Sequence, residues 1–316
     1  MSYLAGVMIP AVSIIIPTFR RPQRAVEAAR SALAQTAQDF EIILVDNDPE
    51  GSALGPLRAL GDPRITVIHE PRAGVANARN AGLRAARGEL IAFLDDDESA
   101  PDVWLSELLR VQATCKADVV FGPVRTRLAS FPRDHHDFFE AFFARDPGHA
   151  EGIIDVFYGC GCSLVRRVAL PSPQPFSAAR NEIGGEDDLL FQGMEAEGAV
   201  FAWAPKAWVW ETPEPSRVTL AYTLRRAFAY GQGPATKAWT GPRRNLTVIA
   251  FWMAVGLAQS VVYGAAALGG FLVKTKRRAF TYRKFVEGLG KLLWFPFIKP
   301  RFYSTAKLPK AKPAAA

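Results

Sequence analysis

Short apolar runs alternate with amphipathic segments through the first hundred residues of the chain. Four runs rich in apolar residues predict strands, at residues 12–17 (VSIIIP), 41–45 (EIILV), 65–69 (ITVIH) and 90–94 (LIAFL), and the first is typical of a strand buried on both faces. Residues 24–35 and 74–87 have the apolar spacing of helices. Because strands alternate with helices, we expect βαβ units and an α/β fold with a mostly parallel sheet flanked by helices.

The pattern becomes less regular after residue 117. We expect further strands at 117–124 and 199–209, a return to the core at 156–165, helices at 189–197 and 216–233, and a helix or loop at 132–148. At the N-terminus, the apolar run up to Phe19 has neither a charged leading region nor a cleavage site. We interpret this run as the approach to the first strand and not as a signal peptide.

The longest apolar run, Leu246–Val273, contains no charged residue over 28 positions and is long enough to cross a bilayer. Basic residues flank it on both sides, so the positive-inside rule does not choose an orientation. The alternatives are a single span, a hairpin, a helix in the membrane plane and a buried helix of a soluble protein. The next apolar stretch, Leu289–Ile298, is too short to span and has the Trp, Phe and Lys content of an interfacial segment.

The net charge of +7 is unevenly distributed over the 316 residues. Residues 274–316 hold twelve Lys or Arg and one acidic residue, a net charge of +11, whereas the preceding residues carry a net charge of −4. A basic tail suits an anionic surface, either a membrane or a nucleic acid. Because Trp and Phe interrupt its charges beside a membrane-length segment, we expect lipid headgroups and no nucleic acid.

These shifts in composition divide the chain into three parts. We expect an α/β domain at 1–240, an apolar membrane helix or hairpin at 241–275, and a basic interfacial tail with a disordered end at 276–316. The three cysteines, Cys115, Cys160 and Cys162, are too few and too irregular for a disulfide framework and suit a reducing compartment. We interpret all three as ordinary thiols.

The strand predicted at 90–94 runs directly into the carboxylates of Asp95, Asp96, Asp97 and Glu98. Adjacent carboxylates repel one another unless they are solvated or neutralised by a cation. An acidic turn that caps the next helix is one explanation. The other is a metal site, because ligands bind at the carboxyl ends of parallel strands. Carboxylate oxygens there can hold Mg²⁺ or Mn²⁺, which in turn holds a diphosphate.

Four motifs follow one another in a specific order. They are IIPTFRR (15–21), ILVDND (43–48), PRAGVANARNAGLRAARGELIAFLDDD (71–97) and GGEDD (184–188). In this order the sequence, over about residues 10–235, resembles the family 2 glycosyltransferases. The resemblance implies the Rossmann-like GT-A fold and a nucleotide-diphosphate sugar as donor.

The resemblance also implies roles for individual residues on the donor side. Pro17, Thr18 and Arg20 match the first nucleotide-contacting loop. Asp46 matches the aspartate that hydrogen-bonds the nucleobase, although an Asx turn after the strand would also place Asp there. Arg79 is the expected contact to phosphate or sugar, through a charge-assisted hydrogen bond.

The acidic cluster matches the metal motif of the family. Asp95 and Asp97 correspond to its outer members, and Asp97 is the first choice as ligand to Mg²⁺ or Mn²⁺, with Asp95 as the second. Asp95 and Asp96 are also expected to contact ribose, sugar or metal-bound water. Their separate roles stay open, because all three positions hold the same residue.

Glu186-Asp187 matches the ED motif of the family at the start of a helix. Inverting transfer needs a general base that takes the proton from the acceptor hydroxyl. Asp187 matches that base, and Asp188 is the weaker candidate. The alternative explanation is that acidic residues are favoured in the first turn of any helix.

Two segments of the sequence depart from the family pattern. Cys160 and Cys162 lie where relatives commonly have a glycine-rich acceptor loop with a polar residue. Glu211 lies where many relatives carry a histidine near the metal. It could ligate the metal directly, bind through water or form a surface salt bridge.

We therefore expect an inverting, metal-dependent glycosyltransferase held by its C-terminal region at the cytoplasmic face of the inner membrane. A membrane position favours a lipid-linked glycan acceptor, and hence cell-envelope or exopolysaccharide biosynthesis. Single-sugar addition is favoured over processive synthesis, because no Gln-x-x-Arg-Trp follows the ED motif.

Two other functions are weaker explanations of the sequence. A nucleotidyltransferase would carry a glycine-rich basic loop after the first strand, but residues 18–21 contain no glycine. A membrane-tethered binding or scaffold protein with a degenerate transferase domain would have no reason to keep both acidic motifs.

Overall fold

The computed structural model describes residues 2–4, 7–129, 132, 134–181, 184–240, 243–273 and 277–300. The chain forms two compact units. Among the described residues, the first holds those up to 125 together with 144–211, and the second holds 126–143 and those from 212 to 300. The helix at Leu220–Thr240 therefore groups with the C-terminal helices, whereas the sequence analysis assigned it to the domain at 1–240.

An eight-stranded sheet organises the first unit, in the order β10-β12-β8-β11-β6-β3-β4-β5. The four strands predicted first are β3 (Val12–Thr18), β4 (Phe40–Asp46), β5 (Ile65–His69) and β6 (Leu90–Phe93), and they pair in parallel. The others are β8 (Val119–Phe121) and β12 (Phe201–Trp203), parallel to each other, and the antiparallel β10 (Gly152–Ile154) and β11 (Ser163–Arg166). The predicted mostly parallel α/β sheet is confirmed.

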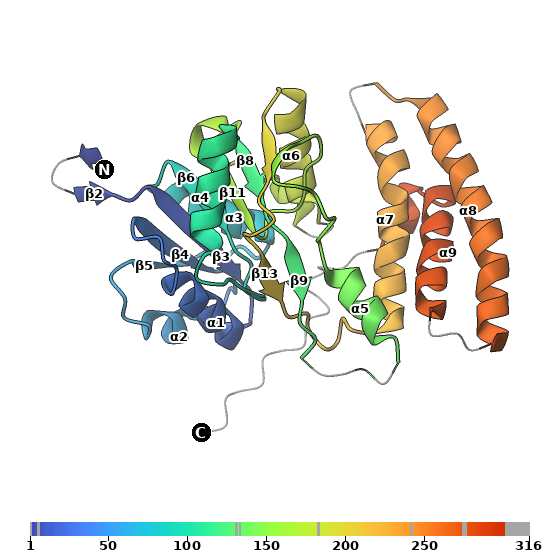
Figure 1. Cartoon of the computed structure of the whole chain (residues 1–316), viewed down its shortest axis with the longest axis horizontal. Helices are drawn as coiled ribbons and strands as arrows, with labels where there is room; N and C mark the ends of the chain where they lie inside the picture. The colour runs from blue at the N-terminus through green and yellow to red at the C-terminus, as the bar shows by residue number, and fades with distance from the viewer. Residues whose placement is uncertain are drawn as a thin grey trace. The chain divides into compact units, whose positions relative to one another are not determined.

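Helices cover both faces of this sheet. Successive side chains of a strand point to opposite faces, so Ile14 and Ile16 pack on one face and Ile15 and Ile43 on the other. The first face carries α1 (Pro22–Leu33), α2 (Leu54–Arg58) and α4 (Trp104–Cys115), and the second carries α3 (Val75–Ala85) and α6 (Glu186–Ala196) (Figure 1). Burial on both faces explains why β3, β4 and β6 appear in the sequence as continuous apolar runs, whereas β5 lies at an edge of the sheet and is only partly buried.

Two of the predicted strands are each interrupted by a proline. Residues 117–124 form β8 and the start of β9 (Val124–Thr126), which are separated at Gly122-Pro123. Residues 199–209 form β12 and the start of β13 (Val209–Glu211), separated by a turn in which Ala207 N donates to Ala204 O. Proline lacks the N–H that a continuing ladder needs.

The remaining short elements complete the first unit. β7 (Glu98–Ser99) joins β13 and β9 in a three-stranded sheet, and β1 (Ser2–Leu4) pairs with β2 (Val7–Ile9). Short 3₁₀ helices lie at Arg167–Ala169 and Ala178–Arg180, with another in the second unit at Pro296–Ile298.

Helices form the described part of the second unit. They are α5 (His136–Phe143), α7 (Leu220–Thr240), α8 (Leu246–Val273) and α9 (Arg278–Leu292), and α9 lies between α7 and α8 (Figure 1). Among the described residues, one helix, at Leu246–Gly269, meets the length and hydropathy expected of a membrane span. The end of the basic tail, KLPKAKPAAA (307–316), which we expected to be disordered, lies outside the described residues.

Candidate active site

The acidic end of β6 is neutralised by arginine side chains from elsewhere in the chain. Asp96 is buried and accepts hydrogen bonds from Thr18 Oγ1 at 2.8 Å and from Arg21 Nη1 at 2.9 Å. The same Arg21 nitrogen lies 3.3 Å from Asp97 Oδ2. Burial raises the pKa of Asp96 to about 6, although Arg21 opposes this shift. Arg21 therefore supplies part of the positive charge that the sequence analysis assigned to a metal.

The loop after β3 presents its two arginines to different partners. Arg20 has a φ of 56°, which is uncommon for a residue other than glycine. Its Nε lies 3.1 Å from Asp48 Oδ1 in the loop after β4, whereas Arg21 reaches the end of β6. The sequence analysis selected Arg20 and missed Arg21. Adjacent arginines in a turn give no local signal of which one faces the acidic cluster.

Asp46 shapes the loop after β4. Its side chain is fully buried, and its two oxygens accept from Asp48 N at 3.1 Å and from Ala53 N at 2.7 Å. This is the Asx-turn arrangement that the sequence analysis held as the alternative. Contact with a nucleobase stays a prediction. Pro17, at the end of β3 and buried, lies opposite Val45.

Arg79 connects the end of β6 with the start of α6. This buried side chain on α3 donates to Glu186 Oε1 at 2.6 Å and lies 3.1 Å from Asp95 Oδ1. Burial raises the pKa of Glu186, although Arg79 opposes the shift. The predicted contact residue Arg79 is thus placed beside the predicted metal ligand Asp95. Its link to Glu186 joins residues 107 positions apart, for which the sequence offered no pairing signal.

The glycines of the loop at 159–162 lie against carboxylates. A Cβ added to Gly159 would lie 2.9 Å from Asp187 Oδ2, and one added to Gly161 would lie 2.6 Å from Glu98 Oε1 and 2.9 Å from Asp95 Oδ2. Arg145 anchors this loop, because it donates to the carbonyl oxygens of Gly159, Gly161 and Gly122. A side chain at Gly159 or Gly161 would force the facing carboxylates to shift, so glycine allows this backbone to approach both acidic motifs.

Both cysteines of this loop are part of the core. Cys160 and Cys162 are fully buried free thiols. Burial raises the pKa of the Cys160 thiol well above its usual range and that of Cys162 to about 12. Trp104 Nε1 lies 3.4 Å from Cys162 Sγ. Although cysteines occupy this loop, its glycines face the acidic motifs. The two thiols point into the core and are in the protonated form.

Asp187 lies in the first turn of α6, beside this loop. Its Oδ2 accepts from Cys160 N at 3.2 Å and its Oδ1 from Asp188 N at 2.9 Å, while Asp188 itself is exposed. We expected the helix to begin at residue 189, but it begins at Glu186, because Gly185 adopts a left-handed conformation with a φ of 77° just before it. The earlier start places Glu186 and Asp187 on the helix itself.

Glu98 is a buried carboxylate that the sequence analysis left without a role. Its Oε2 accepts from Asp95 N at 2.9 Å, and burial raises its pKa well above its usual range. Its strand β7 pairs with β13 so that Glu211 lies opposite Glu98. Glu211 is therefore placed on a strand adjoining the acidic cluster, and its role toward a metal stays a prediction.

The acidic cluster offers hard oxygen donors to a divalent cation. In the described part of the chain, no group of three or more His, Cys, Asp or Glu side chains is arranged to hold a metal by itself. Mg²⁺ is commonly bound by one or two carboxylates together with substrate phosphates, so three protein ligands are not required. The side chain of Asp95 is 37% exposed and that of Asp97 is 11% exposed, and this pair fits such a site.

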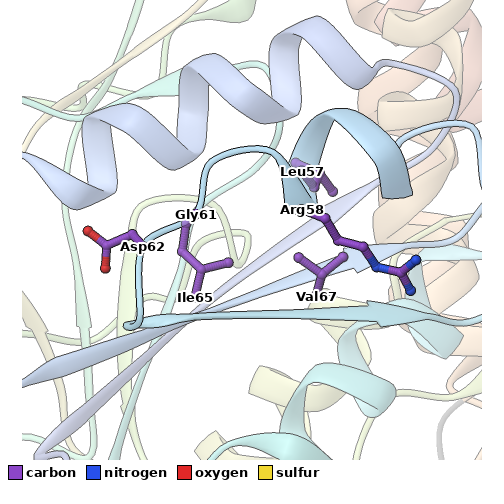
Figure 2. Close-up of a pocket in the computed structure, with 6 residues that line it drawn as sticks. All are labelled: Leu57, Arg58, Gly61, Asp62, Ile65 and Val67. Carbon is purple, nitrogen blue, oxygen red and sulfur yellow. The ribbon is translucent and has the colours of Figure 1, made fainter.

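Two surface pockets in the described part of the chain are lined by residues outside these clusters. Figure 2 shows one of about 230 Å³ beside the edge strand β5, with Arg58 and Asp62 at opposite ends and Ile65 and Val67 between them. Another, of about 310 Å³, is lined by Gln112, Ala113, Lys116 and Arg166. Neither is lined by a predicted site residue. The candidate site is therefore defined by its charged clusters.

Comparison with known proteins assigns the family. Residues 13–171 match the family described as glycosyl transferase family 2. The succinoglycan biosynthesis protein ExoM of Rhizobium meliloti (strain 1021) is 34% identical over 228 residues, which cover 70% of this chain and 73% of ExoM. The chain belongs to glycosyl transferase family 2. It is a glycosyltransferase, and the resemblance described above is confirmed.

Solved structures of other glycosyltransferases share the fold. The mannosyltransferase PcManGT from Pyrobaculum calidifontis, in complex with GDP-Man and Mn²⁺, aligns with a TM-score of 0.61 at 20% identity and covers 91% of this chain and 88% of its own. TarS 1–349 of S. aureus, in complex with UDP-GlcNAc, aligns with a TM-score of 0.50 at 17% identity, covering 88% and 89%. The predicted GT-A fold is confirmed.

Proposed function

We propose that this glycosyltransferase moves one sugar from a nucleotide-diphosphate sugar to a lipid-linked glycan acceptor, with inversion and with Mg²⁺ or Mn²⁺, in cell-envelope or exopolysaccharide assembly. The observation that carries the proposal is the link through Arg79. This buried guanidinium joins Asp95 of the first acidic motif to Glu186, the neighbour of Asp187 in the second. Through these two contacts, the proposed donor site and the candidate base belong to one connected group of charged residues.

The donor side is assigned to the carboxyl ends of β3, β4 and β6. Pro17, Thr18, Arg20 and Asp46 would hold the nucleoside, and Arg79 would contact phosphate or sugar once its carboxylate partners rearrange. Asp97 and Asp95 would hold the cation, with Asp96 beside them. When bound, the cation supplies positive charge against the departing diphosphate. PcManGT, crystallised with GDP-Man and Mn²⁺, supports this assignment by family likeness.

Asp187 would act as the base. Its Oδ2 faces the glycine loop, where backbone lies close enough that a side chain at Gly159 would collide with it. The carboxylate would take the proton of the acceptor hydroxyl as that oxygen attacks the anomeric carbon from the face opposite the diphosphate. One such displacement inverts the configuration at that carbon.

The acceptor class follows from the C-terminal region. The apolar helix α8 and the basic residues that flank it would keep the enzyme at the cytoplasmic face of the membrane, where a lipid-linked acceptor is presented. The likeness to a succinoglycan biosynthesis protein supports an envelope or extracellular glycan as product.

Calorimetric titration tests the donor side. The full chain is titrated with UDP, GDP and dTDP, with and without Mn²⁺, alongside Asp97→Asn. We expect one nucleotide to bind with Mn²⁺, and the substitution to weaken that binding by about tenfold or more. NMR of the first-formed product should show inverted anomeric configuration. Absence of nucleotide binding by folded protein, or retained configuration, would contradict the proposal.

A further inference from the structure

The exposed face of α8 is entirely uncharged. Between Leu246 and Gly269 every exposed residue is apolar or small except Thr247. Large side chains follow one another along this face, with Phe251 60%, Val261 64% and Leu268 65% exposed. Such a continuous apolar face on a protein surface marks a contact with a membrane or with another protein.

Two polar residues near the middle of α8, Gln259 and Ser260, point the other way, toward α9. Gln259 donates from Nε2 to Lys284 O at 2.6 Å and accepts from Lys291 Nζ at 2.9 Å. Ser260 is buried, and a Cβ on Gly288 would lie 2.7 Å from its Oγ. A helix with polar groups inward and apolar groups outward is suited to hydrocarbon on its outer side.

The charges of α9 argue against a span through the bilayer. Gly256 and Ser260, near the middle of α8, lie against Gly288. The neighbouring α9 residues Glu287 and Lys291 are therefore level with the centre of α8. If α8 crossed the membrane, these charged groups would lie near the bilayer midplane, where ionised side chains are costly.

We propose that α8 lies in the plane of an anionic phospholipid surface, with its outer face immersed among the lipid chains and with α9 on the side away from the lipid. Basic residues at both ends complement this surface: Arg243 and Arg244 precede α8, and Arg277 and Arg278 follow it. A helix in the plane keeps both basic ends on one side of the membrane, which a single span cannot do. The inference rests on the membrane association in the proposed function and deepens it.

Vesicle flotation tests the surface itself. The full chain is mixed with vesicles of phosphatidylcholine and phosphatidylglycerol, or of phosphatidylcholine alone. We expect flotation with the anionic vesicles that weakens as salt is raised, and an approximately tenfold loss in the double variant Leu257→Glu/Val261→Glu. The matched control is Ile153→Glu/Val168→Glu, which changes two exposed apolar residues of the first unit and should float as the wild type does.

Spin-label depth measurements distinguish the plane from the span. Labels are attached at Phe251→Cys, Val261→Cys and Leu268→Cys in a Cys115→Ser background, since the other two thiols are buried. An in-plane helix gives the same shallow depth at all three positions. A deep label at 261 with shallow labels at 251 and 268 would overturn the proposal in favour of a span.

Two further results would also overturn it. One is failure of the wild type to float. The other is self-association in the absence of lipid that the glutamate pair abolishes, because the face would then serve a second copy of the chain. Nucleotide titration of the same variants is independent of this surface. If the wild type binds nucleotide but does not float, the proposed membrane surface is wrong and the donor site is unaffected. If neither the wild type nor any variant binds nucleotide, the proposed donor site is wrong.

Discussion

The two units of the chain place their polar and apolar groups in opposite ways. In the first unit the apolar side chains are inside, and buried carboxylates gather at the end of β6, where arginines face them. In α8 of the second unit the apolar side chains are outside, and Gln259 and Ser260 face the neighbouring helix. The difference agrees with the proposal that the exposed face of α8 meets lipid, whereas the surface of the first unit meets water.

The comparison also shows what buried charge requires. Asp95, Asp96 and Glu186 each contact a guanidinium, because an unpaired charge away from water is costly. Glu287 of α9 follows the same rule. Its Oε1 lies 2.7 Å from Arg283 Nε, and its Oε2 lies 3.2 Å from Lys284 Nζ. Both units therefore contain buried carboxylates that pair with basic side chains, whereas Asp46 and Glu98 of the first unit accept backbone N–H groups. Only the first unit gathers several buried carboxylates, at a place where a diphosphate and a cation could replace the internal partners.

The largest effect is expected from the candidate base. Asp187→Asn should lower the transfer rate by about 10²–10⁴-fold, because the amide cannot take the acceptor proton. Donor binding by calorimetry should stay unchanged. The transfer rate is measured with radiolabelled donor sugar. Asp188→Asn, which changes the exposed neighbour of Asp187, is the matched control and should keep most of the rate. Equal losses of transfer rate in both variants would mean that Asp187 is not the general base.

Loss of the central guanidinium tests the pairing of buried charge. Arg79→Met should lower the free energy of unfolding by about 3–5 kcal/mol in urea titrations, because Asp95 and Glu186 would lose their shared partner. Arg166→Met removes the more exposed pair with Asp118 and should cost under about 1 kcal/mol. If both variants lowered the free energy of unfolding by similar amounts, burial would not determine how much these ion pairs stabilise the fold.

The glycine loop gives a sharper steric test. Gly161→Ala should destabilise the fold by about 1–3 kcal/mol, because the new methyl group would meet Glu98 and Asp95. Gly193→Ala, on α6 with open space around it, should instead stabilise by about 0.5–1 kcal/mol through helix propensity. Thermal and urea unfolding of both variants would show these opposite signs. A neutral Gly161→Ala would mean that the loop moves easily away from the acidic cluster.

The smallest effect concerns pH. The hydrogen bond from Arg72 lowers the pKa of Glu70 below its ordinary value of 4.5. A carboxyl whose pKa is lower in the folded state contributes stability above pH 4.5, and this contribution is lost as the pH falls through the folded pKa. Glu70→Gln should therefore flatten the loss of stability below about pH 5. The exposed Glu195→Gln should leave the profile unchanged, and an identical slope in both would refute the prediction.

Much of the first unit could be predicted from local patterns. Strands β3 to β6 and helices α1 and α3 were located within a few residues, because burial on both faces and helical spacing leave periodic signals along the chain. The structure brings Thr18 into contact with Asp96 and Arg79 into contact with Asp95, whereas the roles of these residues toward a donor stay predictions. The breaks at Pro123 and Pro205 were missed, although a missing N–H donor is visible in the sequence.

The sequence by itself determined the α/β pattern, the order of the acidic motifs and an apolar helix at Leu246–Val273, since each depends on residues close together in the chain. Tertiary structure alone decided that Arg21 and not Arg20 neutralises Asp96, that Arg79 reaches Glu186, and that glycines rather than cysteines face the carboxylates. It also decided which face of α8 stays exposed. These pairings join segments tens of residues apart, and only the packing of the folded chain selects among the partners that the sequence offers.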